Sequence, residues 1–140
     1  MPLRTYERSV FLSGDDTWYH HWNGWESVVA HTQSLGLESW PASYFSQTEL
    51  SQCRYLRGSY LLEWNGRGSI MTMPWSGSTD NWNACTAVDL GLPLGAKYQV
   101  ATGVWRRDFT TGYVIVNPTW SAVTVGGVSI PSGDAVLHQN

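Results

Sequence analysis

Charged residues are scarce in this chain of 140 residues: 8 are basic, 11 are acidic, and together they make up 14% of the sequence. Globular proteins usually carry about a quarter, so Ser, Thr, Asn, Gln and Gly must hydrate the surface. The net charge is −3, and only Arg106 and Arg107 are adjacent bases. Binding to phosphates needs a clustered basic surface, so the composition argues against a nucleic acid partner.

Cysteine and long apolar runs are also sparse. Cys53 and Cys85 are the two cysteines. A disulfide between them is open, but we take reduced thiols as the default, because one pair does not define a disulfide framework. The first eight residues lack the apolar core of a signal peptide, and no stretch has the length of a membrane span. For the chain as given we expect a cytoplasmic protein without a membrane partner; secretion stays open if a leader has been lost with a truncated N-terminus.

The motifs of several enzyme classes are missing as well. There is no phosphate-binding loop, no dinucleotide-binding fingerprint and no Gly-x-Ser-x-Gly nucleophile elbow. His20, His21 and His31 follow Asp15 and Asp16, but their spacing matches no metal-ligand motif, and two adjacent histidines do not easily face one ion. We therefore predict surface histidines, with no metal and no cofactor.

Tryptophan, in contrast, is abundant. The nine tryptophans are Trp18, Trp22, Trp25, Trp40, Trp64, Trp75, Trp82, Trp105 and Trp120. Indole rings fill cores and interfaces, and their faces also stack on the C–H faces of sugar rings. For a single tryptophan we favour packing, whereas for the set we expect some role at the surface.

The first half of the chain alternates between strand and helix patterns. We expect a strand over residues 9–13, a helix over 23–36, a strand over 39–45, a helix over 46–66 and a strand over 69–73. Asn23 with Glu26, and Ser46 with Glu49, are the N-terminal signals of the two helices. Two consecutive βαβ units place parallel strands side by side through right-handed crossovers.

The last third of the chain has an all-β pattern. We expect strands over residues 98–109, 113–117, 122–125, 128–130 and 135–138. In the hairpin closed by Thr110, Thr111 and Gly112, alternation places Tyr113, Ile115 and Asn117 on one face and Val114 and Val116 on the other. The predicted fold class is α+β. We expect a partial (β/α) barrel-like βαβαβ segment over residues 1–75, a linker over 76–84 and an antiparallel β-sandwich-like domain over 85–140.

The hairpin also resembles one from a family of carbohydrate-active barrel enzymes. Its Gly-Tyr-Val-Ile-Val-Asn-Pro run is similar to the Arg-x-Phe-x-Asn-Gly-x-Val-x-Val-Asn-Pro signature of the uncharacterised glycoside-hydrolase-like family fifteen and related putative glycosidases, with Thr111 in place of the asparagine. Residues 60–64, 69–73 and 89–93 resemble the family's last barrel helix, last barrel strand and Asp-x-Gly-x-Pro link. The resemblance covers residues 50 to 138.

The resemblance implies the C-terminal part of a barrel enzyme. A complete barrel takes about 250 residues, so catalytic residues on strands that this chain lacks cannot be carried over. Three parallel strands also cannot close an eight-stranded barrel, which leaves open sheet edges and an apolar face. We therefore expect a homo-oligomer.

The candidate site follows the ends of the predicted parallel strands, where ligands bind in such sheets. Asp15 and Asp16 are the catalytic candidates. Glycoside hydrolysis needs two carboxyl groups on opposite sides of the bond, which adjacent residues rarely provide, so one would act with a carboxylate from another chain. The competing interpretation is a polar loop that caps the next helix. The candidate sugar-binding residues are Trp18, Tyr19, His20, His21, Trp22, Trp25, Tyr44 and Trp75.

Three functions are consistent with these features. The leading hypothesis is a carbohydrate-active, glycoside-hydrolase-like protein that binds an oligosaccharide or polysaccharide through the aromatic-rich 15–25 loop, and hydrolyses it if a second chain completes the site. The alternatives are a non-catalytic carbohydrate-binding module, and an assembly protein with tryptophan-rich subunit interfaces.

Overall fold

The structure, a computed structural model, describes residues 18–37, 42–44, 50–67, 71–73, 85 and 87–140. Its elements are α2 (Trp18–Ser34), β1 (Ala42–Tyr44), α3 (Leu50–Glu63), β2 (Met71–Met73), β3 (Tyr98–Ala101), β4 (Val104–Phe109), β5 (Gly112–Asn117), β6 (Val123–Val125), β7 (Val128–Ile130) and β8 (Asp134–Gln139). The fold is a mixed α+β arrangement, as the sequence predicts.

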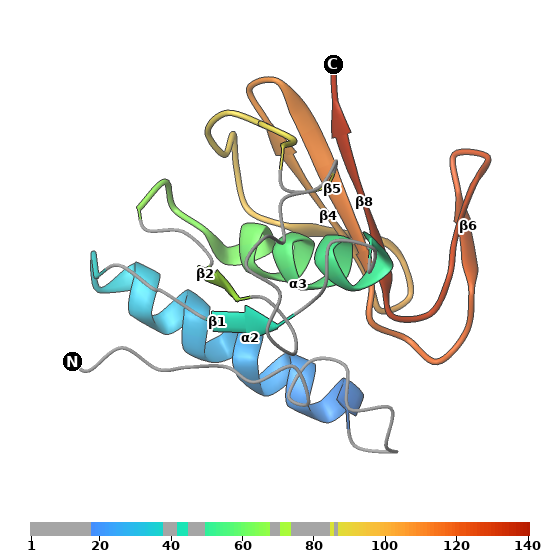
Figure 1. The fold of residues 1–140 in the computed structure, drawn as a ribbon, viewed down its shortest axis with the longest axis horizontal. Helices are drawn as coiled ribbons and strands as arrows, with labels where there is room; N and C mark the ends of the chain where they lie inside the picture. Colours follow the sequence, from blue (N-terminus) through green and yellow to red (C-terminus); the bar gives the residue numbers. More distant parts are fainter. Residues whose placement is uncertain (1–17, 38–41, 45–49, 68–70, 74–84, 86) are drawn as a thin grey trace.

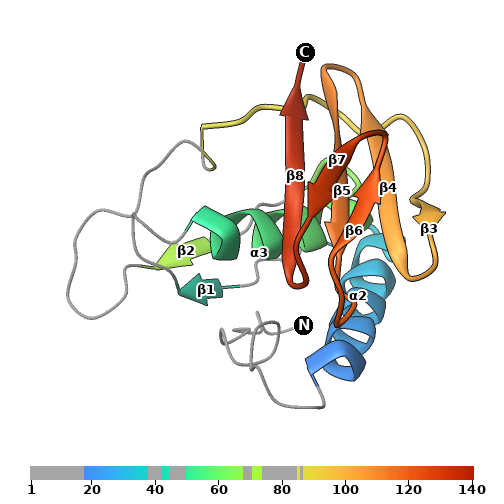
Figure 2. The same ribbon diagram turned by 90° about the vertical axis from the view of Figure 1, so that its right-hand side faces the viewer.

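The described residues contain an antiparallel sheet of four strands, in the order β3-β4-β5-β8. Helix α3 lies across one face of this sheet (Figure 1). The two-stranded β6–β7 hairpin lies against the opposite face (Figure 2). The predicted sandwich is thus confirmed only in part, because its second layer consists of a single hairpin.

The predicted alternation along β5 is confirmed. Val114 and Val116 join the larger core beneath the helices. Ile115 instead packs with Val104 and Ile130 in a smaller core between the sheet and the β6–β7 hairpin. The period of two residues along a strand places successive side chains on opposite faces, so β5 has buried side chains on both of its faces.

One βαβ unit of the predicted segment is present. Strands β1 and β2 pair in parallel, with Ala42 opposite Met71, and α3 connects them. The predicted strand over residues 9–13 lies outside the described residues, and the described ranges show no closed barrel. Within the same ranges, no helix is long and apolar enough to cross a membrane.

Two element boundaries differ from the prediction. Helix α2 begins at Trp18, so Asn23 lies inside the helix and is not its N-cap. The expected strand over 98–109 is a hairpin of β3 and β4, because Gly103 adopts a positive φ of 73° that reverses the chain. Glycine reaches this conformation without steric cost. A single glycine within a long β-favouring run is hard to recognise as the position of a turn.

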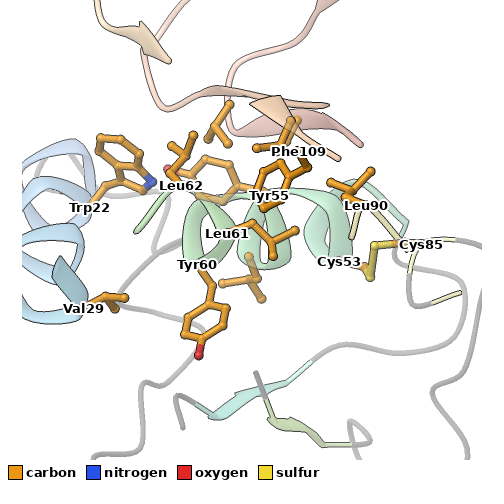
Figure 3. Packing of buried hydrophobic residues seen from close by; sticks show 14 residues of the cluster. Trp22, Val29, Cys53, Tyr55, Tyr60, Leu61, Leu62, Cys85, Leu90 and Phe109 are labelled. Carbon is orange, nitrogen blue, oxygen red and sulfur yellow. A yellow bond between two sulfur atoms is a disulfide. The ribbon is translucent and has the colours of Figure 1, made fainter. Parts of the chain in front are cut away.

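The helices and the sheet share one hydrophobic core (Figure 3). Trp22 and Val29 of α2, Leu56 and Leu62 of α3, and Phe109 of β4 all belong to it. The packing therefore joins segments from both sides of the predicted linker. The domain boundaries proposed at residues 75 and 85 stay a prediction.

The two cysteines form a disulfide, which corrects our default of reduced thiols. Cys53 on α3 and Cys85 are bonded, with their Cα atoms 6.3 Å apart. Both side chains are buried at one end of the core (Figure 3). The pairing depends on the spatial approach of a helix and a loop, which the spacing of two cysteines does not reveal.

Candidate functional site

For most of the predicted site residues, the structure does not describe a side chain. Asp15, Asp16 and Trp75 fall outside the described residues. Trp18, Tyr19, His20, His21 and Trp25 belong to α2, and Tyr44 ends β1, but only the backbone is described at these positions. The part of these residues in ligand binding therefore stays a proposal.

Trp22 has a structural position that does not suit a stacking platform. Its side chain is 1% exposed, and its indole N–H donates a hydrogen bond of 2.7 Å to Oγ of Ser59 on α3. The indole thus packs between the two helices, with no open face for a sugar ring. Trp22, Glu26, Val29 and Gln33 are all buried, and their spacing is that of one helix face. We did not recognise this face in the sequence, because two of its four residues are polar.

A buried carboxyl group lies on the same face of α2. Glu26 is 3% exposed, and within the described part of the chain neither of its carboxyl oxygens has a hydrogen-bond partner. Burial raises the pKa of Glu26 well above its usual value; the positive charge of Lys97 lowers it and the negative charge of Glu63 raises it further. The physical cause is the loss of water around the charged form.

Lys97 links this carboxyl group to its surroundings. Its ammonium contacts Oε1 of Glu63 on α3 and lies 3.9 Å from Oε2 of Glu26. The same ammonium lies 4.9 Å from the ring centre of Trp105 and 5.8 Å from that of Trp22. A cation over an indole face is attracted by the negative potential of the ring. We call Glu26, Lys97 and Glu63 the charged cluster.

Trp105 connects the charged cluster to a surface cleft. The cleft has a volume of about 450 Å³ and is lined by Asn23, Gln99, Thr102, Gly103, Trp105, Thr119 and Trp120. This volume falls within the range of small-molecule sites. None of the lining side chains carries a charge, and Trp120 is 53% exposed. The cleft therefore combines indole faces with amide and hydroxyl groups, which can both donate and accept hydrogen bonds.

The Asn-Pro end of the hairpin sequence positions one wall of this cleft. Asn117 is fully buried, and its amide donates to the carbonyl oxygens of Ser121 at 2.8 Å and Ile130 at 3.0 Å. Its side-chain oxygen accepts hydrogen bonds from the backbone N–H and the hydroxyl of Thr119. These bonds hold the turn after β5, and with it Trp120, against the β6–β7 hairpin.

Our sequence reasoning did not find this cleft. Asn23 comes from the predicted aromatic stretch 15–25, but the other walls come from the β3–β4 hairpin and the turn after β5. These segments are far apart in the chain. The abundance of tryptophan was the available signal, but it does not say which tryptophans meet.

The described residues thus form a mixed α+β fold with a surface cleft lined by two tryptophans and by uncharged polar side chains. Residues 11–113 match the family described as Hypothetical glycosyl hydrolase family 15. This match spans most of the chain, so the chain belongs to that family, and the family that the sequence resembles is confirmed; the match ends at residue 113, within the hairpin. The match also begins nearer the N-terminus than the resemblance did. Neither curated proteins nor solved structures gave a match.

Proposed function

We propose that this chain is a carbohydrate-active protein that binds a neutral oligosaccharide or polysaccharide in the cleft between Trp105 and Trp120. The observation that carries this proposal is the pairing of two indoles with uncharged amide and hydroxyl groups. A sugar ring presents C–H faces for stacking and hydroxyl groups for hydrogen bonding. A phosphorylated or strongly acidic ligand would find no cation among the lining residues. Membership of a hypothetical glycosyl hydrolase family supports the same ligand class.

The aromatic stretch at the start of α2 would extend this binding surface. Asn23 lies within the 15–25 stretch and lines the cleft, so neighbouring side chains of the stretch are suitably placed in sequence to contact a longer glycan. We keep Trp18, Tyr19, His20, His21, Trp25, Tyr44 and Trp75 as proposed contacts.

Hydrolysis is the finer part of the proposal. Asp15 or Asp16 would act with a carboxylate from another chain, since two carboxyl groups must flank the scissile bond. The alternative is a non-catalytic binding module. Turnover of a polysaccharide panel by the Asp15→Asn and Asp16→Asn variants separates the two, because a module would bind glycan equally well with either substitution and release no product.

We expect the Trp120→Ala variant to bind its glycan about fivefold more weakly than the wild type, because one aromatic stacking contact contributes about 1 kcal/mol. Isothermal titration calorimetry with neutral gluco-, xylo-, manno- and chito-hexasaccharides measures this loss. Leu94→Ala is the matched control, since Leu94 is an apolar side chain with 66% exposure that does not line the cleft. Equal affinities for Trp120→Ala and the wild type would contradict the proposed site.

We also propose a homo-oligomer. Among the described residues, β3 and β8 are the outer strands of the four-stranded sheet, and β1 and β2 form a parallel pair. Unpaired strand edges favour association. Analytical ultracentrifugation at micromolar concentration should show a dimer or a larger assembly, and a stable monomer would refute this expectation.

A further inference from the structure

Trp105 is the residue that the cleft and the charged cluster have in common. It lines the cleft, and it packs against the larger core. The ammonium of Lys97 lies over its ring, 4.9 Å from the centre. Lys97 is held in turn by Glu63 and faces the buried Glu26. A shift of the ammonium therefore acts directly on a wall of the cleft.

We propose that Glu26, acting through Lys97, positions the indole of Trp105 and thereby sets the affinity of the cleft for sugar, an inference that rests on the proposed function. Glu26 and Lys97 do not line the cleft, so both are positioning residues. The affinity of the same cleft then depends on pH through the protonation of Glu26.

The charged groups around Glu26 come from three elements. Lys97 precedes β3 and Glu63 lies at the end of α3. Arg107 of β4 donates hydrogen bonds to the backbone oxygens of Leu61 and Trp64 at the end of α3, and it interacts electrostatically with Glu63. Among the described residues, Glu26 thus faces the cation of Lys97 and the anion of Glu63, and Arg107 interacts with Glu63.

The direction of the effect follows from the protonation of Glu26. When Glu26 is protonated, Glu63 is the ionised carboxylate that faces Lys97 in the described structure, and the ammonium stays over Trp105. An ionised Glu26 attracts the ammonium toward α2 and weakens its contact with the indole. Because burial raises the pKa of Glu26, we expect Glu26 to ionise at a pH above the range in which an exposed glutamate ionises. Trp105 is then held less firmly, and sugar binds more weakly as the pH rises.

The first experiment measures the affinity for a hexasaccharide that binds the wild type, between about pH 5 and pH 9. The wild type should lose about threefold to tenfold in affinity across this range. Glu26→Gln imitates the protonated form and should keep the higher affinity at every pH. Lys97→Met keeps an unbranched apolar side chain but lacks the ammonium, so the binding of this variant should be weak and independent of pH.

Glu63→Gln is the matched control for Glu26→Gln, because it removes the other carboxylate of the same cluster. The charge of Glu63 raises the pKa of Glu26. The Glu63→Gln variant should therefore keep the pH dependence, with its midpoint moved to lower pH. A Glu26→Gln variant that retains the wild-type slope would overturn the inference.

A measurement without sugar separates this inference from the proposed function. The indole N–H resonance of Trp105, assigned by its loss in Trp105→Phe, should titrate with pH in the wild type and in Glu63→Gln, but not in Glu26→Gln. If this pattern appears although no glycan binds, the positioning by Glu26 is supported and the proposed function fails. If glycan binds but the resonance does not titrate, the inference is overturned and the proposed function stands.

Thermal unfolding adds a readout of the burial of Glu26. The pKa of Glu26 is raised in the folded state, so the folded protein binds its proton more tightly than the unfolded chain does. The contribution of Glu26 to the free energy of unfolding is complete at a pH below the ordinary carboxyl pKa. It is lost as the pH rises toward the raised pKa of the folded state. The melting temperature of the wild type should therefore fall relative to that of Glu26→Gln with increasing pH.

Discussion

Gly112→Ala is expected to destabilise the chain by about 3 kcal/mol or more, at the upper end of what overpacking costs. A Cβ atom at this position would lie 1.9 Å from the backbone oxygen of His138 and 2.8 Å from Cδ2 of Leu90. Gly112 pairs with Gln139 of β8, so the neighbouring backbone is part of the sheet ladder and cannot move aside without breaking hydrogen bonds. Urea unfolding followed by tryptophan fluorescence measures the loss.

Gly95→Ala provides the control for this substitution. A Cβ atom at Gly95 would meet no heavy atom within 4 Å, so the same chemical change should leave the unfolding free energy within about 0.5 kcal/mol of the wild type. A Gly112→Ala variant as stable as Gly95→Ala would mean that β5 and β8 are not as closely paired as described.

Loss of the Cys53–Cys85 disulfide is expected to cost about 2 to 4 kcal/mol. The bond joins residues 32 positions apart, and closing a loop of this size restricts the unfolded chain by that order of free energy. For a chain of this length the loss corresponds to about 10 °C in melting temperature. The Cys53→Ala and Cys85→Ala double variant, compared with the wild type with and without reductant, tests this expectation.

The reductant provides the internal control. It should lower the melting temperature of the wild type to near that of the double variant and should not change the double variant itself. A reductant-insensitive wild type, with a melting temperature equal to that of the variant, would show that the bond does not form. Because disulfides persist in oxidising compartments, a confirmed bond would favour secretion over the cytoplasmic location expected from the sequence.

Local patterns in the sequence predicted the elements that local forces determine. The alternation over residues 112–117 predicted both faces of β5 correctly, because the period of a strand depends only on its own backbone. The helix expected over residues 46–66 is observed as α3 (Leu50–Glu63), and the strands on either side of it pair in parallel. The motifs of the hairpin and of the segments before it also indicated the family whose model matches residues 11–113, because a sequence motif requires no knowledge of tertiary contacts.

Contacts between distant segments determined the features that the sequence did not predict, because such contacts leave no periodic pattern in the sequence. Trp22 has the ring of a stacking platform but is buried, since it donates to Ser59 of α3 and packs in the larger core. Glu26 looked like a capping residue, and tertiary packing placed it beside the charges of Lys97 and Glu63. The sequence by itself thus determined most of the strands and helices and the family, which depend on local propensity and on motif. Only the tertiary structure determined the disulfide, the buried carboxyl group and the cleft, because each of them requires side chains from segments that the chain brings together only when it folds.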